Sequence, residues 1–242
     1  MEQPDVCLFS VETEYRNSHF GVDWQQAMLA GYRVGKWSIV ADADELLVWQ
    51  HPQTASMNEL LEQPEFENSD AARVFMLDMY PKASLNTANF ETGDLFAEAH
   101  YSDYQPFHNA GSASGPYSDQ PGWVSALRHR LMPRSRPNLF SAQKLALLRY
   151  HPGLRLSEGL HFIGGARIAE RELIFAHFKY NSAFLEKAQT EVARQQHFND
   201  AEEYRRYLAL EAEGRNVIYD PTVSVPWYSA PFVAARLDSK SE

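Results

Sequence analysis

Three carboxylates stand within four positions of the chain, immediately after an apolar segment. Residues 37–41 (Trp-Ser-Ile-Val-Ala) precede Asp42, Asp44 and Glu45, and a second apolar segment follows at residues 46–49. On an extended chain Asp42 and Asp44 point to the same side, because side chains alternate with a period of two. Carboxylates this close repel each other unless a cation lies between them, and their oxygens suit hard divalent cations. The spacing indicates a metal site, although an Asp-x-Asp triplet also occurs in solvated loops.

The elements around this triplet determine where it would lie. Residues 37–41 have the length and β-branched content of a buried strand. Residues 6–11 also read as a strand, and residues 24–32 have a helical apolar spacing, with Asp23 as a candidate N-cap. Strand, helix, strand predicts a parallel crossover unit, in which residues 37–41 form an interior strand. The acids would then lie beyond the carboxyl end of that strand, where ligands of open α/β sheets gather.

The rest of the chain predicts further elements. Ser56 with Glu59 three residues later forms a capping box at the start of a short helix. The other expected elements are strands over residues 73–80, 143–150 and 173–176, a strand within 123–131, a mobile loop at 111–116, a helix from Asn181 or Ser182 to about Glu213, and a tail that wraps the domain.

Composition narrows the classes of protein. The 242 residues are 44% hydrophobic, which fits one globular domain with a sizeable core. The formal net charge of −10 argues against broad nucleic-acid binding. A single cysteine, Cys7, excludes an internal disulfide framework, and we expect a cytoplasmic protein. No apolar stretch approaches the roughly 18 residues of a membrane span, so a membrane contact would be peripheral.

Three segments carry a resemblance to a known family. Residues 37–48 (WSIVADADELLV) resemble the Asp-x-Asp region of family 2-like glycosyltransferases with a GT-A fold, in particular a bacterial subgroup with a DADE or DVDEF tetrad. Residues 173–180 (LIFAHFKY) resemble the LLHFKY strand of that subgroup. Residues 195–198 and 203–207 resemble its R-x-E-H-F…EYRRY helix. The matches occur in the same order and cover most of residues 15–207.

The resemblance implies a fold and an activity. The fold is α/β, a GT-A-like three-layer α/β/α sandwich over residues 1–215 with a mostly parallel central sheet, followed by the tail at residues 216–242. A GT-A domain normally begins with further strand–helix units that hold the nucleotide. Either the chain is an N-terminally shortened member, which we favour, or its first strand matches a later strand of the family. The implied activity is transfer of a sugar, with inversion, from a UDP- or GDP-sugar to a glycan or other surface-polysaccharide acceptor.

The resemblance also assigns roles to individual side chains. Asp44 becomes a direct ligand of Mn²⁺ or Mg²⁺, and Asp42 contacts the metal through water or binds the donor ribose. His177, at the end of the strand over residues 173–176, becomes a third metal ligand. Without the resemblance, a histidine in that position reads as a core residue with satisfied hydrogen bonds.

Three arginines are candidates for contact with the donor diphosphate. Arg16 precedes the helix at residues 24–32, and Arg128 and Arg130 would share one face of a strand. The planar guanidinium group matches phosphate geometry. The alternatives are a surface arginine in a loop for Arg16 and a solvent-exposed edge strand for the other two.

An inverting transferase needs a base within hydrogen-bonding reach of the acceptor hydroxyl. Asp78 comes late in the strand over residues 73–80, and Asp103 lies in a long aromatic loop. Asp78 is preferred because a strand holds geometry better than a loop, and it should emerge at the same end of the sheet as Asp44. A lone acid near a strand end is also commonly bonded to local groups.

Two other classes of function remain open. A shortened or degenerate homologue would act as a non-catalytic binding module. A metal-dependent hydrolase would also use clustered aspartates, but it requires further Asp or His ligands at close spacing. The sequence shows no second cluster of that kind.

Overall fold

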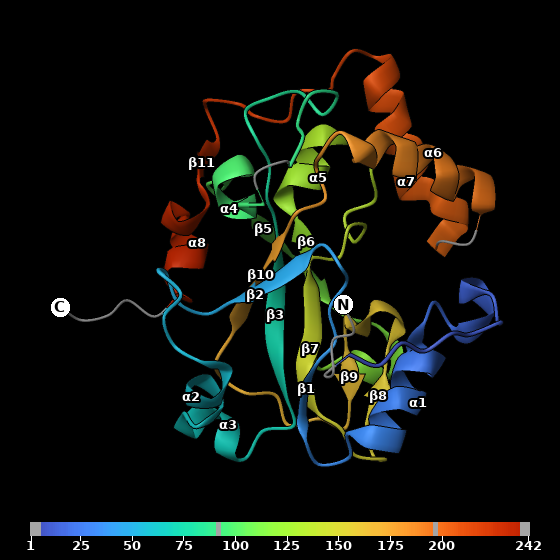
Figure 1. Cartoon of the computed structure of the whole chain (residues 1–242), viewed down its shortest axis with the longest axis vertical. Helices are drawn as coiled ribbons and strands as arrows, with labels where there is room; N and C mark the ends of the chain where they lie inside the picture. The colour runs from blue at the N-terminus through green and yellow to red at the C-terminus, as the bar shows by residue number, and fades with distance from the viewer. Residues whose placement is uncertain (1–5, 91–92, 196–197, 238–242) are drawn as a thin grey trace.

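The computed structural model describes residues 6–90, 93–195 and 198–237 (Figure 1). Its main sheet contains, in spatial order, β1 (Trp37–Ile39), β7 (Gln143–Arg149), β3 (Ala71–Asp78), β10 (Leu173–His177) and β2 (Glu45–Val48). Smaller sheets pair β4 (Tyr101–Asp103) with β11 (Ser224–Pro226), β5 (Phe107–Ser112) with β6 (Pro121–Ser125), and β8 (Arg155–Leu156) with β9 (Ile163–Gly164).

Helices surround this sheet. The α-helices are α1 (Val22–Tyr32), α2 (Met57–Leu61), α3 (Pro64–Glu67), α4 (Leu95–Glu98), α5 (Ala126–Leu131), α6 (Ala183–Arg194), α7 (Phe198–Ala212) and α8 (Pro231–Ala234). Short 3-10 helices are η1 (Tyr15–Ser18), η2 (Gly115–Tyr117), η3 (Glu158–Leu160) and η4 (Trp227–Ser229). Among the helices described, none has the length and apolarity needed to cross a bilayer.

The mixed α/β class is confirmed, but the expectation of a mostly parallel sheet is wrong. Within the main sheet, β3 and β10 are parallel, whereas the β1–β7, β7–β3 and β10–β2 pairs are antiparallel. Residues 6–11 are exposed and form no strand, so β1 has no crossover partner before it. Strand β7 inserts between β1 and β3 instead. As a result, residues 37–41 are not an interior strand: β1 lies at the sheet edge, and Ile39 is 42% exposed.

The segment of residues 40–44, which we call the acidic connection, joins two strands at opposite edges of the sheet. Strand β1 forms one edge and β2 the other, although they are consecutive in sequence (Figure 1). The acidic connection therefore passes over the end of the sheet at which β3 and β10 finish and β7 begins. This path brings its carboxylates to the termini of the central strands.

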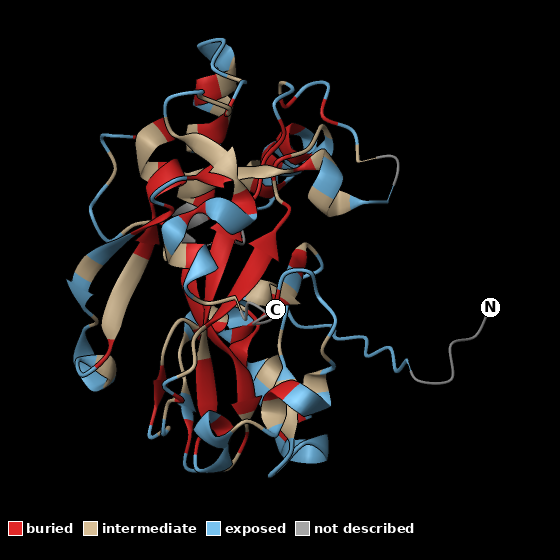
Figure 2. Ribbon diagram, turned by 90° about the vertical axis from the view of Figure 1, so that its left-hand side faces the viewer, coloured by how far each residue is buried: buried red, intermediate tan, exposed pale blue. Residues whose placement is uncertain are grey.

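Both faces of the central strands are covered, which explains their continuous apolar runs. Phe75 and Leu77 of β3 belong to a cluster that includes residues from the β5–β6 hairpin and the C-terminal segment, such as Trp227. The neighbouring residues Val74 and Met76 face a second cluster, which α2 and α3 cover. Figure 2 shows the resulting buried strands at the centre of the molecule.

Several local predictions are confirmed. Ser56 and Glu59 form both hydrogen bonds of the capping box at the start of α2. Strands β3, β7 and β10 lie within one or two residues of their expected ranges. The segment after residue 215 also packs against the domain, because β11 pairs with β4 and Val233 of α8 is buried.

Other local predictions are wrong. Helix α1 begins after Gly21, whose φ of 85° places it in the left-handed region, and not at Asp23. The expected single helix to residue 213 consists of α6 and α7, because Gln195 ends α6 in a left-handed conformation. Residues 196–197 of the resembling helix segment lie outside the described residues. The expected loop at 111–116 instead includes the end of β5 and the start of η2.

Candidate functional site

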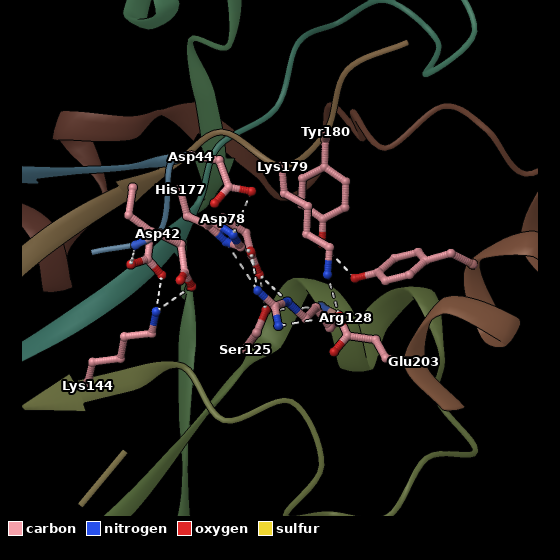
Figure 3. Close-up of polar contacts among 12 residues, drawn as sticks. Asp42, Asp44, Asp78, Ser125, Arg128, Lys144, His177, Lys179, Tyr180 and Glu203 are labelled. Carbon is pink, nitrogen blue, oxygen red and sulfur yellow. Dashed lines mark hydrogen bonds and ion pairs between the residues drawn. The ribbon is translucent and has the colours of Figure 1, made fainter. Parts of the chain in front are cut away.

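Charged side chains from four strands meet at the end of the main sheet over which the acidic connection passes (Figure 3). In the strand register, His177 of β10 lies opposite Glu45 of β2 on one side and Asp78 of β3 on the other. Lys144 is the second residue of β7, at the same end. The prediction that Asp78 emerges at the same sheet end as Asp44 is confirmed by their shared neighbour, His177.

Asp44 and His177, which the resemblance assigns to one metal ion, lie close together. The distance from Asp44 Oδ2 to His177 Nε2 is 3.7 Å. The Phe178 N–H donates a 2.8 Å hydrogen bond to the Asp44 carbonyl oxygen, which ties the acidic connection to the end of β10. Lys187 of α6 brings its Nζ to 3.8 Å from the Asp44 carboxylate. The Asp44 side chain is 28% exposed, so solutes have access to it.

The second ring nitrogen of His177 faces a buried carboxylate. His177 Nδ1 lies 3.0 Å from Asp78 Oδ1 and 3.2 Å from Arg128 Nη2. An ionised carboxylate only accepts hydrogen bonds, and a guanidinium only donates them. In the tautomer that carries its proton on Nδ1, the ring donates to Asp78, Arg128 Nη2 bonds Asp78 and not the ring, and the Nε2 lone pair faces the Asp44 side. This is the arrangement in which a carboxylate orients a metal-binding histidine.

Asp78 is held in a buried ion pair with Arg128. Its oxygens accept hydrogen bonds from Arg128 Nε (2.9 Å), Arg128 Nη2 (2.8 Å) and the Ser125 hydroxyl (2.6 Å). Burial opposes ionisation of Asp78, but Arg128 and His177 hold its pKa well below the usual range. A carboxylate with such a low pKa is a weak proton acceptor. The base role of Asp78 stays a prediction, and this geometry argues against it.

The buried pair continues into α7. Arg128 Nη1 lies 3.4 Å from Glu203 Oε1, and Lys179 Nζ lies 2.6 Å from the same oxygen. Burial opposes ionisation of Glu203, but Lys179 and Arg128 lower its pKa to about 2. Burial also lowers the pKa of Lys179, although Glu203 opposes that shift. Figure 3 shows Arg128 between Asp78 and Glu203, so this network links the sheet end to α7.

Lys144 already supplies a cation to the acidic triplet. Its Nζ lies 2.7 Å from Asp42 Oδ2 and 2.6 Å from Glu45 Oε1. The Asp42 N–H donates to the other Glu45 oxygen at 3.0 Å. Burial tends to raise the pKa of Asp42, but Lys144 outweighs it and the pKa is lowered. The Asp42 side chain is 67% exposed, whereas that of Glu45 is 1% exposed.

Arg128 and Arg130 lie on α5 and not on a strand, which corrects the expectation that they share a face. Residues two positions apart on a helix differ by about 200° in direction. Arg130 accordingly binds Asp103, through Nε at 3.0 Å and Nη2 at 2.9 Å. Asp103 also accepts a 2.6 Å hydrogen bond from the Tyr80 hydroxyl. The structure thus separates the Asp103–Arg130 pair from the Asp78–Arg128 pair, and the predicted phosphate and base roles of these residues stay predictions.

Arg16 lies exposed in η1, next to Tyr15. Burial and the Asp42 carboxylate raise the pKa of Tyr15, so Tyr15 is the residue of η1 that the structure links to the acidic connection. The phosphate role of Arg16 stays a prediction.

Sequence reasoning missed several members of the site. Lys144 is not among the predicted site residues, although a lysine in a buried apolar strand is itself a signal of an internal ion pair. Lys179 and Glu203 lie in segments that carry the family resemblance, but the resemblance assigns no role to either residue. His161 was also missed: its Nδ1 donates a 2.7 Å hydrogen bond to the Gln143 carbonyl oxygen, and burial lowers its pKa to about 4.

The side chains at the sheet end could supply only part of the coordination of a metal ion, and a bound ligand would have to supply the rest. Among the described residues, no group of three His, Cys, Asp or Glu side chains that could hold a metal ion occurs. Asp44 and His177 offer one oxygen and one nitrogen donor, which Mn²⁺ accepts. Mg²⁺ in proteins commonly takes one or two carboxylates and completes its coordination with substrate phosphates. The donor set therefore suits an ion that a phosphate ligand helps to hold.

Comparison with protein-family models, with curated proteins and with solved structures finds no match to this chain. The family resemblance therefore rests on the three sequence segments alone.

Proposed function

We propose that this protein is a metal-dependent glycosyltransferase that moves a sugar from a UDP- or GDP-sugar to a glycan or other surface-polysaccharide acceptor, with inversion. The observation that supports the proposal best is the meeting of Asp44 and His177. They lie far apart in sequence, yet their side chains are 3.7 Å apart beside the accessible acidic connection. One oxygen and one nitrogen donor suit recognition of a metal diphosphate.

In this proposal, Asp44 and His177 hold Mn²⁺ or Mg²⁺ together with the donor diphosphate. When bound, the metal neutralises charge on the departing diphosphate. Lys187, whose Nζ is 3.8 Å from Asp44, provides a further positive group for the phosphates. Asp42 is ionised and exposed, so it is available to accept hydrogen bonds from ribose hydroxyls. Arg16 remains a candidate for the diphosphate.

The acceptor base is the least supported part of the proposal. Asp78 and Asp103 are each engaged by a guanidinium group, and both are buried. Either carboxylate would have to leave its ion pair before it accepted a proton.

One observation favours a second candidate, a non-catalytic binding module. Lys144 lies within 2.7 Å of both Asp42 and Glu45, so the repulsion within the triplet is relieved without a metal. A degenerate site that has lost its metal would be stable in this arrangement. The two candidates differ in whether a divalent ion and a nucleotide bind together.

Mn²⁺ binding, measured by calorimetry and by water-proton relaxation, distinguishes them. We expect weak binding of Mn²⁺ alone and tighter binding in the presence of UDP or GDP. Asp44→Asn and His177→Gln should each weaken binding of Mn²⁺ with the nucleotide by about tenfold or more. The matched control is Asp23→Asn, which removes the carboxylate of an exposed His–Asp pair, His19–Asp23 at 2.8 Å, elsewhere on the chain.

Equal Mn²⁺ binding by the wild type, Asp44→Asn and Asp23→Asn would reject the metal site. Release of sugar from UDP- and GDP-sugars, with and without Mn²⁺, then tests the activity. Nucleotide binding that needs no metal and gives no sugar release would support the binding module instead.

A further inference from the structure

A second candidate site lies on the opposite side of α5 from His177. It is a surface pocket of about 270 Å³. The residues that line it include Asp103, Tyr104, Gln105, His108, Arg130 and Thr222. Because Arg130 points away from the Asp78–Arg128 pair, this pocket is distinct from the sheet-end site.

The floor of the pocket is the Asp103–Arg130 ion pair, and it is rigidly held. Besides its two bonds to Asp103, Arg130 donates from Nη2 to the Ile218 carbonyl oxygen at 3.2 Å. Tyr80 donates to Asp103 and its hydroxyl is 2.8 Å from Ser224 Oγ. Within the described part of the chain, Arg130 Nη1 has no hydrogen-bonding partner. The two N–H groups of Nη1 on this fixed guanidinium therefore remain for a ligand.

The rim of the pocket carries polar and aromatic side chains, and hydrogen bonds hold its backbone in place. Tyr104 is 51% exposed, and Gln105, His108 and Thr222 are also exposed. The Tyr104 N–H donates to the Val223 carbonyl oxygen at 2.8 Å, which joins the two sides of the rim. The Ala126 N–H donates to the Pro106 carbonyl oxygen at 2.9 Å and anchors the rim to α5. The exposed Tyr104 ring is therefore attached to a backbone that hydrogen bonds hold in place.

The chemistry of this lining restricts the ligand. Asp103 and Arg130 cancel in charge, so the floor does not select an anion or a cation. Amide, imidazole and hydroxyl groups on the rim donate and accept hydrogen bonds, and an apolar ligand would leave them unpaired. The tyrosine ring offers an apolar face with a polar edge. The volume is below that of pockets for drug-sized ligands, which begin at about 300 Å³.

We propose that this pocket binds a single neutral saccharide ring. The apolar face of the ring packs on Tyr104, and its hydroxyls bond to Gln105, Thr222 and the free Nη1 of Arg130. The proposal does not depend on transferase activity at the sheet end, because any protein that contacts a glycan has a use for such a pocket.

Nuclear magnetic resonance titration of the full chain tests this inference. The probes are the methyl glycosides of glucose, galactose, mannose and N-acetylglucosamine, with sodium acetate as an anionic probe. At least one glycoside should shift backbone amides around residues 103–108 and 222–223 with a millimolar Kd, as expected of a weak single-ring contact. Tyr104→Ala should weaken that binding by about tenfold. The control Tyr32→Ala removes another exposed tyrosine, 66% exposed on α1, and should leave binding unchanged.

Gln105→Ala provides a second variant if Tyr104→Ala does not fold, and it should weaken binding by a smaller factor. The inference is overturned if no glycoside shifts these amides. It is also overturned if the shifts survive Tyr104→Ala and Gln105→Ala, if they centre on residues 42–45, or if acetate binds as tightly as the glycosides.

Discussion

Asp42 and Asp78 form similar ion pairs at the same end of the sheet, but in different surroundings. Asp42 lies 2.7 Å from Lys144, and Asp78 lies 2.8 Å from Arg128. The Asp42 side chain is 67% exposed, whereas that of Asp78 is 3% exposed. Water can replace the partner of Asp42, but nothing replaces the partner of Asp78. The comparison indicates that the exposed pair is free to exchange its cation for a ligand, while the buried pair maintains the architecture beneath it.

The largest expected effect comes from breaking the buried pair. Arg128→Met removes the guanidinium from the buried Asp78 and leaves it only Ser125 and His177 as partners, so it should lower the free energy of unfolding by about 3–5 kcal/mol. Denaturant unfolding measures this change. Arg136→Met is the matched control, because Arg136 pairs with Glu202 at 3.3 Å and is 59% exposed; its effect should be below about 1 kcal/mol. The double variant Asp78→Asn with Arg128→Met should recover part of the loss. Equal stability of both arginine variants would refute the distinction.

An ionisable group that is hydrogen-bonded to a backbone carbonyl oxygen, and not held in an ion pair, sharpens the comparison. Burial lowers the pKa of His161 from 6.5 to about 4. Between these values the unfolded chain binds the proton and the folded chain does not, so stability falls as the pH is lowered from about 6.5 to 4. The shift corresponds to at most about 3 kcal/mol. Unfolding measured across this pH range should be flatter in His161→Gln than in wild type. The exposed control His19→Gln should leave the slope unchanged.

Removing Lys144 separates the two carboxylates that share it. Lys144→Met should cost about 2 kcal/mol, chiefly because Glu45, with a 1% exposed side chain, loses its partner. Adding Glu45→Gln should restore much of the loss, whereas adding Asp42→Asn should restore little because Asp42 is hydrated. Unfolding of these double variants measures the difference. Equal recovery by both would contradict the role that we assign to burial.

The smallest effect on stability is expected at Asp42 itself. Asp42→Asn should change the free energy of unfolding by less than about 1 kcal/mol, because the exposed pair contributes little. If Asp42 serves the donor, the same variant should still weaken nucleotide binding in the Mn²⁺ titration. A stability loss as large as that of Arg128→Met would show that the two pairs are equivalent.

Local features of this fold could be predicted from sequence, but strand pairing could not. The Ser56–Glu59 capping box involves neighbouring residues, so its pattern is sufficient. The partner of β1 is β7, more than a hundred positions later, and nothing near Trp37 specifies it. The helical state of Arg128 and Arg130 did have a local signal. Ser125 caps α5 by accepting a hydrogen bond from the Arg128 N–H at 3.2 Å.

The candidate site also combines features that the sequence could predict with features that it could not. The approach of Asp44 to His177 could be expected because a family resemblance placed both residues at one sheet end. The cations that neutralise the other acids could not, because Lys144 and Arg128 reach Asp42 and Asp78 only after β7 and α5 have docked. Sequence spacing indicated that the acids needed a counter-charge, but three-dimensional packing decided that lysine and arginine supply part of it.

The path of the acidic connection also constrains the order of folding. Strands β1 and β2 are the first two strands of the main sheet to leave the ribosome, yet each pairs only with a much later strand. Strand β1 cannot pair until β7 has been synthesised, and β2 cannot pair until β10, which ends at His177, has been synthesised. Such long-range closures give a high contact order and slow folding. The nascent chain therefore exposes each of these two strands unpaired while more than a hundred further residues are synthesised, a period in which chaperones can bind them.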